Sequence, residues 1–131
     1  MKRLAIILGI ITAFSACRKV EQSYTFRVSN SNSQDITVSF NLDVEGYHAD
    51  TTYSYTVPAG ATKDIFIHLQ PDGQKTIDDI FPVPEPIYSN FTVTKSGQTA
   101  STDFLQQGQW TFTKENDYTG IYDLDVDSLD F

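Results

Sequence analysis

Cysteine and histidine are scarce in this chain of 131 residues, which holds one cysteine, Cys17, and two histidines, His48 and His68. One cysteine leaves no disulfide inside the chain, and so few cysteine and histidine ligands argue against a structural zinc site. The sequence also lacks the motifs of serine hydrolases and zinc proteases and the glycine loop that cradles phosphate. We therefore expect a protein that is not an enzyme, with no cofactor and no bound metal.

Long apolar runs are also missing. The longest covers residues 4–14, which is 11 residues broken only by Gly9 and Thr12, whereas a membrane-spanning helix needs about 20. Two basic residues precede this run, and the small residues Ser15 and Ala16 follow it. A basic start, a short apolar centre and small residues before a cleavage point are typical of a secretory signal peptide. We therefore expect residues 1–16 to be a signal peptide.

The segment Phe14-Ser15-Ala16-Cys17 resembles a lipobox, with Phe14 where the family usually has Leu. This resemblance implies cleavage before Cys17, a diacylglyceryl group on its sulfur and an acyl chain on its new amino group, an anchor that holds lastingly to a membrane. The family's inner-membrane retention signal is an Asp where this chain has Arg18. The resemblance therefore implies an outer-membrane lipoprotein facing the periplasm or the cell surface. An ordinary secretory signal with a chance cysteine is the alternative.

Basic residues are few compared with acidic ones. The chain has 9 lysines and arginines against 17 aspartates and glutamates, a net charge of −8. Loss of residues 1–16 would leave 7 basic against 17 acidic residues, a net charge of −10. Such a surface repels phosphate, because nucleic-acid binding needs basic patches. We therefore exclude nucleic acid as a partner, and expect membrane contact through lipidated Cys17.

From Tyr24 onward, apolar residues recur at every second position, the period of strands with one buried face. The clearest case is residues 36–44, where a slip of one position would expose the whole apolar set. In the segment 65–69 the same pattern predicts that Ile65, Ile67 and Leu69 are buried. The other strands are expected around residues 24–28, 53–57, 91–93, 98–102, 110–112 and 122–126.

Seven or eight short strands at roughly ten-residue spacing predict an all-β domain. We expect an antiparallel sandwich, with a small β-barrel as the alternative. One helical turn is expected at residues 76–81, before Pro82 stops it. Residues 17–23 would then be a lipidated tether, and residues 24–131 the β-sandwich domain.

Three segments fall in a familiar order: residues 24–30, residues 57–65 with their Val-Pro-Ala-Gly turn, and residues 118–126 after Trp110. Together they resemble small Bacteroidota lipoproteins of largely unknown function with an immunoglobulin-like sandwich. The resemblance covers nearly all of the mature chain and implies that fold. Its motifs are strand and turn features, which specify a fold and not a chemistry.

Carboxylates at Asp123, Asp125 and Asp127 have the spacing of the first ligands of a calcium loop. Ser128 stands where that loop needs glycine, so we favour three carboxylates on the solvent face of a strand, with weak cation binding as the alternative. His48 and Asp50 have the spacing of a base and its orienting acid, but they lack a nucleophile, and solvated loop residues are the favoured interpretation.

Aromatic residues and prolines suggest two binding surfaces. Trp110 with Tyr47, Tyr53, Tyr55 and Tyr118 could stack on sugar rings, although most of them should be core at this spacing. The proline-rich residues 82–86 could occupy a proline-binding groove, although a loop or edge that blocks sheet aggregation is favoured.

Two tripeptides, Asp50-Thr51-Thr52 and Asp127-Ser128-Leu129, resemble the acceptor pattern for O-glycosylation of exported Bacteroidota proteins. This resemblance implies that Thr51 and Ser128 are exposed and are candidates for modification.

The leading functional hypothesis is a non-catalytic envelope lipoprotein whose sandwich is an interaction or structural module. The alternatives are a proteinaceous inhibitor or accessory subunit of a secreted enzyme, and a glycan-binding module. A protein or glycan partner is therefore expected, and its identity is open.

Overall fold

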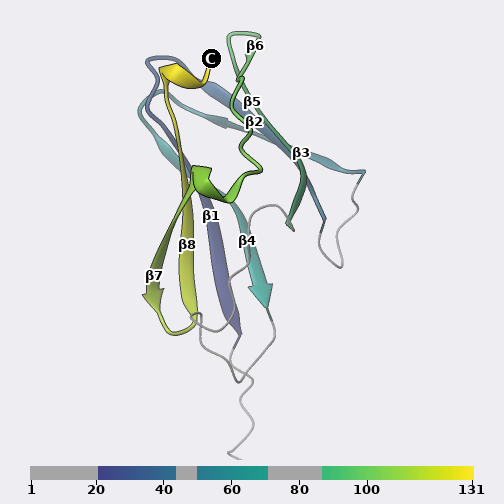
Figure 1. Ribbon diagram of the computed structural model, residues 1–131, viewed down its shortest axis with the longest axis vertical. Helices are drawn as coiled ribbons and strands as arrows, with labels where there is room; N and C mark the ends of the chain where they lie inside the picture. The colour runs from purple at the N-terminus through teal and green to yellow at the C-terminus, as the bar shows by residue number, and fades with distance from the viewer. Residues whose placement is uncertain (1–20, 44–49, 71–86) are drawn as a thin grey trace, which may run out of the picture.

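Strands dominate the computed structural model, which describes residues 21–43, 50–70 and 87–131 (Figure 1). Within these ranges, no helix is long and apolar enough to cross a membrane. The elements, in chain order, are β1 (Gln22–Asn30), β2 (Ile36–Leu42), β3 (Thr52–Val57), β4 (Thr62–Gln70), β5 (Tyr88–Lys95), β6 (Gln98–Thr99), η3 (Gln107–Gln109), β7 (Trp110–Asn116), β8 (Thr119–Val126) and η4 (Ser128–Asp130).

Two four-stranded sheets pack together as a sandwich, with the order β4-β1-β8-β7 in one and β3-β2-β5-β6 in the other. The predicted all-β sandwich is confirmed, and the barrel alternative is wrong because the described strands form two separate sheets that do not close on each other. The prediction of purely antiparallel sheets is also wrong. Strands β1 and β8 run parallel, with Tyr24 beside Gly120 and Val28 beside Leu124, and most of the chain connects them, as a parallel pair requires a long crossover.

Alternation in β1 and β2 follows the prediction. Buried and partly exposed residues alternate along the whole of both strands. The apolar set of β1 and that of β2 therefore face each other across the sandwich, which is the arrangement that a half-buried sheet needs.

Strand β4 departs from the predicted pattern. Ile65 is buried, but Ile67 and Leu69 are 52% and 56% exposed, so their predicted burial is wrong. The reason is a β-bulge: Phe26 pairs with Phe66, whereas the next residue of β1 pairs with Asp64. Ile65 is the extra residue, and a bulge turns all later side chains of its strand to the opposite face.

Other predicted segments are shorter than expected or fall outside the described residues. Strand β6 ends at Thr99 and does not reach residue 102. The predicted helical turn at residues 76–81, the proline-rich residues 82–86, and Val44 all lie outside the described residues.

Tyr88 of β5 lies at the centre of the contact between the sheets. Its ring is edge-on to Phe26 of β1 at 5.3 Å and to Phe40 of β2 at 5.1 Å. It also stacks on Trp110 of β7 at 6.0 Å. Rings at these separations attract each other beyond the area they bury. Burial raises the pKa of Tyr88 well above its usual value, and its hydroxyl finds no hydrogen-bond partner among the described residues.

The side-chain amide of Asn30, the last residue of β1, is buried and holds two turns together. The Asn30 side chain is 2% exposed, and its Nδ2 donates to the carbonyl oxygens of Gln34, Val57 and Pro58 at 2.9, 3.0 and 3.1 Å. Its Oδ1 accepts from the backbone N–H of Asn32 at 3.0 Å. One side chain thus satisfies backbone groups from two turns, the one between β1 and β2 and the one between β3 and β4.

We predict that Phe40→Ala lowers the free energy of unfolding by about 3 to 5 kcal/mol, because Phe40 is buried and packs on Tyr88. Asp125→Ala should lower the free energy of unfolding by less than about 1 kcal/mol, because Asp125 is exposed on the outer face of β8. Urea unfolding of both variants checks this expectation. Equal midpoints would mean that the strand faces are wrongly assigned.

A second prediction concerns Asn30. Asn30→Ala should lower the free energy of unfolding by about 2 to 4 kcal/mol, because it leaves buried carbonyl oxygens without a donor. Asn90 is exposed in β5, so Asn90→Ala is the matched control and should change stability by less than about 0.5 kcal/mol. A similar loss in both variants, measured by urea unfolding, would contradict the role given to Asn30.

Candidate functional site

The predicted row of carboxylates divides into two groups in the structure. Asp123 and Asp125 lie on the outer face of β8, as expected, opposite the buried Leu124. Asp127 instead caps η4. Its Oδ1 accepts from the N–H of Leu129 at 2.6 Å, and its own backbone N–H donates to Oδ2 of Asp130. This reciprocal capping box uses Asp127 for local structure.

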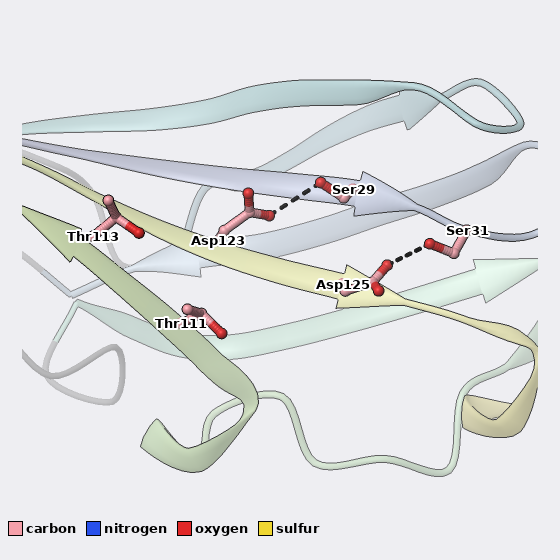
Figure 2. Close-up of a pocket in the computed structure, with 6 residues that line it drawn as sticks. All are labelled: Ser29, Ser31, Thr111, Thr113, Asp123 and Asp125. Atoms are coloured by element: carbon pink, nitrogen blue, oxygen red, sulfur yellow. Dashed lines mark hydrogen bonds between the residues drawn. The ribbon is translucent and has the colours of Figure 1, made fainter. Parts of the chain in front are cut away.

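Asp123 and Asp125 line a shallow open groove (Figure 2). The groove lies on the outer face of the sheet β4-β1-β8-β7, which we call the mixed sheet because β1 and β8 run parallel in it. Ser29 of β1 donates to Asp123 at 3.1 Å, and Ser31 donates to Asp125 at 2.6 Å. Thr111 and Thr113 of β7 complete the lining (Figure 2). Parallel pairing of β1 and β8 creates this arrangement, because it places Ser29 beside Asp125 and within hydrogen-bonding reach of Asp123.

The lining is hydroxyl and carboxylate, which limits what the groove can do. Each carboxylate already accepts a hydrogen bond from a serine, and no three His, Cys, Asp or Glu side chains converge anywhere in the described ranges. Small-molecule sites are usually concave and largely apolar. The groove can offer hydrogen bonds to a polar ligand, but its lining holds no histidine to activate a nucleophile.

Aromatic residues proposed for sugar stacking are mostly part of the core. Trp110 is buried, and its Nε1 donates to the carbonyl oxygen of Phe104 at 2.7 Å. Tyr53 and Tyr55 are partly buried and stack on Phe40 at 5.7 and 5.9 Å. Tyr118 is 41% exposed. The prediction of a core role is confirmed for Trp110, and Tyr47 lies outside the described residues.

Of the two histidines, only His68 is described, and it lies within an aromatic cluster. Its ring centroid is 6.4 Å from both Tyr24 and Phe66. Burial lowers the pKa of His68 from its usual value. Asp50 is exposed in a turn before β3, and its proposed partner His48 lies outside the described residues. The sequence did not indicate a packing role for His68, because its inward orientation follows from the bulge in β4.

Both candidate glycosylation residues are exposed. Thr51 lies just before β3, and Ser128 begins η4. Cys17 lies outside the described residues, and β1 begins at Gln22, five positions after it. The lipidation and glycosylation assignments therefore stay predictions.

We predict that stability falls as the pH drops below about 6.5, the ordinary histidine pKa, and that His68 contributes to the fall. Because the pKa of His68 is lowered on folding, the unfolded chain binds this proton more readily, and acid favours unfolding. The loss should begin near the unfolded pKa and continue down to the folded pKa.

His68→Gln tests this contribution, because every other ionisable group is the same in both proteins. Urea unfolding at about pH 7.5 and about pH 5.5 should show a smaller pH difference in the variant. An identical difference would show that His68 does not contribute.

Comparisons with protein-family models, with curated proteins and with solved structures found no match to this chain. A functional assignment therefore depends on the residues and the geometry of this chain.

Proposed function

We propose that this chain is a non-catalytic envelope lipoprotein, held to the outer membrane by lipid on Cys17, whose sandwich serves as an interaction or structural module. The observation that carries the proposal is the position of Cys17. It stands directly after a signal-like segment and shortly before the first strand, which begins at Gln22. A lipid anchor and a folded domain joined by a short tether are the parts of such a protein.

The length of the tether limits where the domain sits. Cys17 and Gln22 are five residues apart, and an extended chain spans at most about 3.3 to 3.6 Å per residue, so the tether reaches about 17 Å. The lipidated domain is therefore held next to the bilayer surface, facing the periplasm or the cell exterior.

The described surface supports a binding or structural role over catalysis. Its groove is open, and its carboxylates are bonded to serines instead of being arranged around a reacting centre.

We assign the domain to small Bacteroidota lipoproteins with an immunoglobulin-like sandwich, in the broad sense of two packed sheets. Its first two strands lie in different sheets, whereas constant-type immunoglobulin domains place them in one.

An inhibitor or accessory subunit of a secreted enzyme is the second candidate. The observation in its favour is the exposed pair Ile67 and Leu69 on the edge strand β4, because contiguous exposed apolar residues often mark partner surfaces. Glycan binding has less support, since Tyr118 is the large aromatic residue that is exposed among the described ones.

O-glycosylation of Thr51 and Ser128 fits this envelope location. Both residues are exposed and stand in the acceptor-like tripeptides. Intact mass analysis of protein from the native host, compared with Thr51→Val and Ser128→Ala variants, would reveal a modification.

We predict that Cys17→Ser abolishes lipidation and releases the protein from membranes, because serine has no sulfur to receive the diacylglyceryl group. Metabolic labelling with a fatty acid and separation of membranes by centrifugation measure both effects. Ser15→Ala is the control, because alanine keeps the residue before Ala16 small and should preserve processing and attachment. A Cys17→Ser protein that is processed and stays with membranes would contradict the proposal.

A further inference from the structure

Exposed apolar residues gather at one end of the outer face of the mixed sheet. Leu69 pairs with Ser23, and Ile67 pairs with Thr25, at the beginning of β1. Directly cross-strand residues share a face, so the half-exposed Leu69 and Ile67 lie beside the first residues of β1. Ile121 of β8 is the partner of Thr25 on its other side and is partly exposed.

Tyr118 brings a third exposed apolar side chain to this end. The backbone N–H of Ser23 donates to the carbonyl oxygen of Tyr118 at 2.8 Å, which holds the turn between β7 and β8 against the start of β1. Tyr118 is 41% exposed. We call Ile67, Leu69 and Tyr118 the apolar rim.

Charged residues occupy the other half of the same face. Arg27 lies further along β1 than Ser23 and Thr25, and its Nε donates to Oδ1 of Asp64 at 2.6 Å. It is also level with Asp123 of β8. Asp125 lies one row further on, beside Ser29. The outer face thus changes from apolar to acidic along the direction of β1.

The apolar rim is the end of the domain nearest to the anchor. Cys17 is six residues before Ser23, and that length of extended chain spans at most about 22 Å. A lipid on Cys17 would therefore keep the bilayer surface within reach of Leu69, which pairs with Ser23. The acidic half of the face would point away from the bilayer.

We infer that the apolar rim docks on the lipid surface and orients the sandwich on the membrane. This inference rests on the proposed lipidation of Cys17. The rim suits an interface, because Leu and Ile enter the acyl boundary and Tyr favours the headgroup level. The acid that precedes Tyr118 in the chain is Asp117, which is paired with Lys114 at 3.1 Å. Next to the anchor, Arg18 and Lys19 outnumber Glu21, and bases near a surface favour anionic headgroups.

The test places a fluorescent label on the rim of the complete lipidated protein. Lipidation consumes the sulfur of Cys17, so Leu69→Cys provides a single free thiol. Leu129 is 87% exposed and lies in η4, which follows the end of β8, whereas Tyr118 of the rim precedes its beginning. Leu129→Cys is therefore the matched control. Both proteins are reconstituted into vesicles of phosphatidylethanolamine and phosphatidylglycerol, with and without brominated phosphatidylcholine.

We expect brominated lipid to quench the label at position 69 several-fold more strongly than the label at position 129. Aqueous iodide should quench the two labels in the reverse order. Equal quenching of both labels by both agents would overturn the inference while leaving lipidation intact. A label at position 69 that is shielded from iodide but not quenched by brominated lipid would also overturn it, because protein would then cover the rim.

A second variant separates docking from the effect of the label itself. In Tyr118→Cys protein, labelled at that position, Ile67→Ser with Leu69→Ser should reduce quenching by brominated lipid, whereas Ser128→Ala should not. Unchanged quenching in the serine pair would contradict docking through the rim. Intact mass and the number of labels per chain report lipidation independently: two labels would mean that Cys17 is free and that the proposed anchor is wrong.

Discussion

The contact of aromatic rings between the two sheets is the interaction on which the rest of the structure depends. Phe26, Trp110 and Tyr122 come from one sheet, and Phe40 and Tyr88 from the other. Phe26 stacks on Tyr122 at 5.0 Å within its sheet and meets Tyr88 edge-on across the interface. With its single cysteine outside the domain, the sandwich has no disulfide to help it, so apolar burial must offset the entropy of folding.

Central strand β1 carries this core on one face and the candidate surfaces on the other. Its inner residues Tyr24, Phe26 and Val28 are fully buried. Its outer residues border the apolar rim at one end and the serine and aspartate groove at the other, where Ser29 donates to Asp123. The core therefore holds β1 in place, and β1 fixes the two surfaces relative to each other.

The bulge in β4 decides the character of the outer face. Without the extra residue Ile65, the alternation would direct Ile67 and Leu69 inward and Phe66 and His68 outward. With it, Phe66 and His68 pack beside Phe26 and Tyr24, and the two aliphatic residues are exposed at the edge of the sheet. Edge strands commonly carry charge to prevent unwanted pairing. An aliphatic pair in that place calls for a covering surface, and the proposed lipid on Cys17 would make the bilayer that surface.

The sequence by itself determined the class of the fold and the positions of most strands. Period-two alternation located β1, β2, β3 and β8, because burial of one sheet face dictates every second residue. Trp110 was correctly expected in the core, and Asp123 and Asp125 on the solvent face. Alternation is a local signal, however, and it carries no information about which strands become neighbours.

Only the tertiary structure decided the remaining features, and each depends on residues distant in the chain. Parallel pairing of β1 with β8 joins Ser29 to Asp123 across most of the domain. The bulge appears only when β4 is aligned with β1, since one unpaired residue is visible only against a partner strand. Asn30 is buried because carbonyl oxygens from two separate turns, between β1 and β2 and between β3 and β4, converge on its amide.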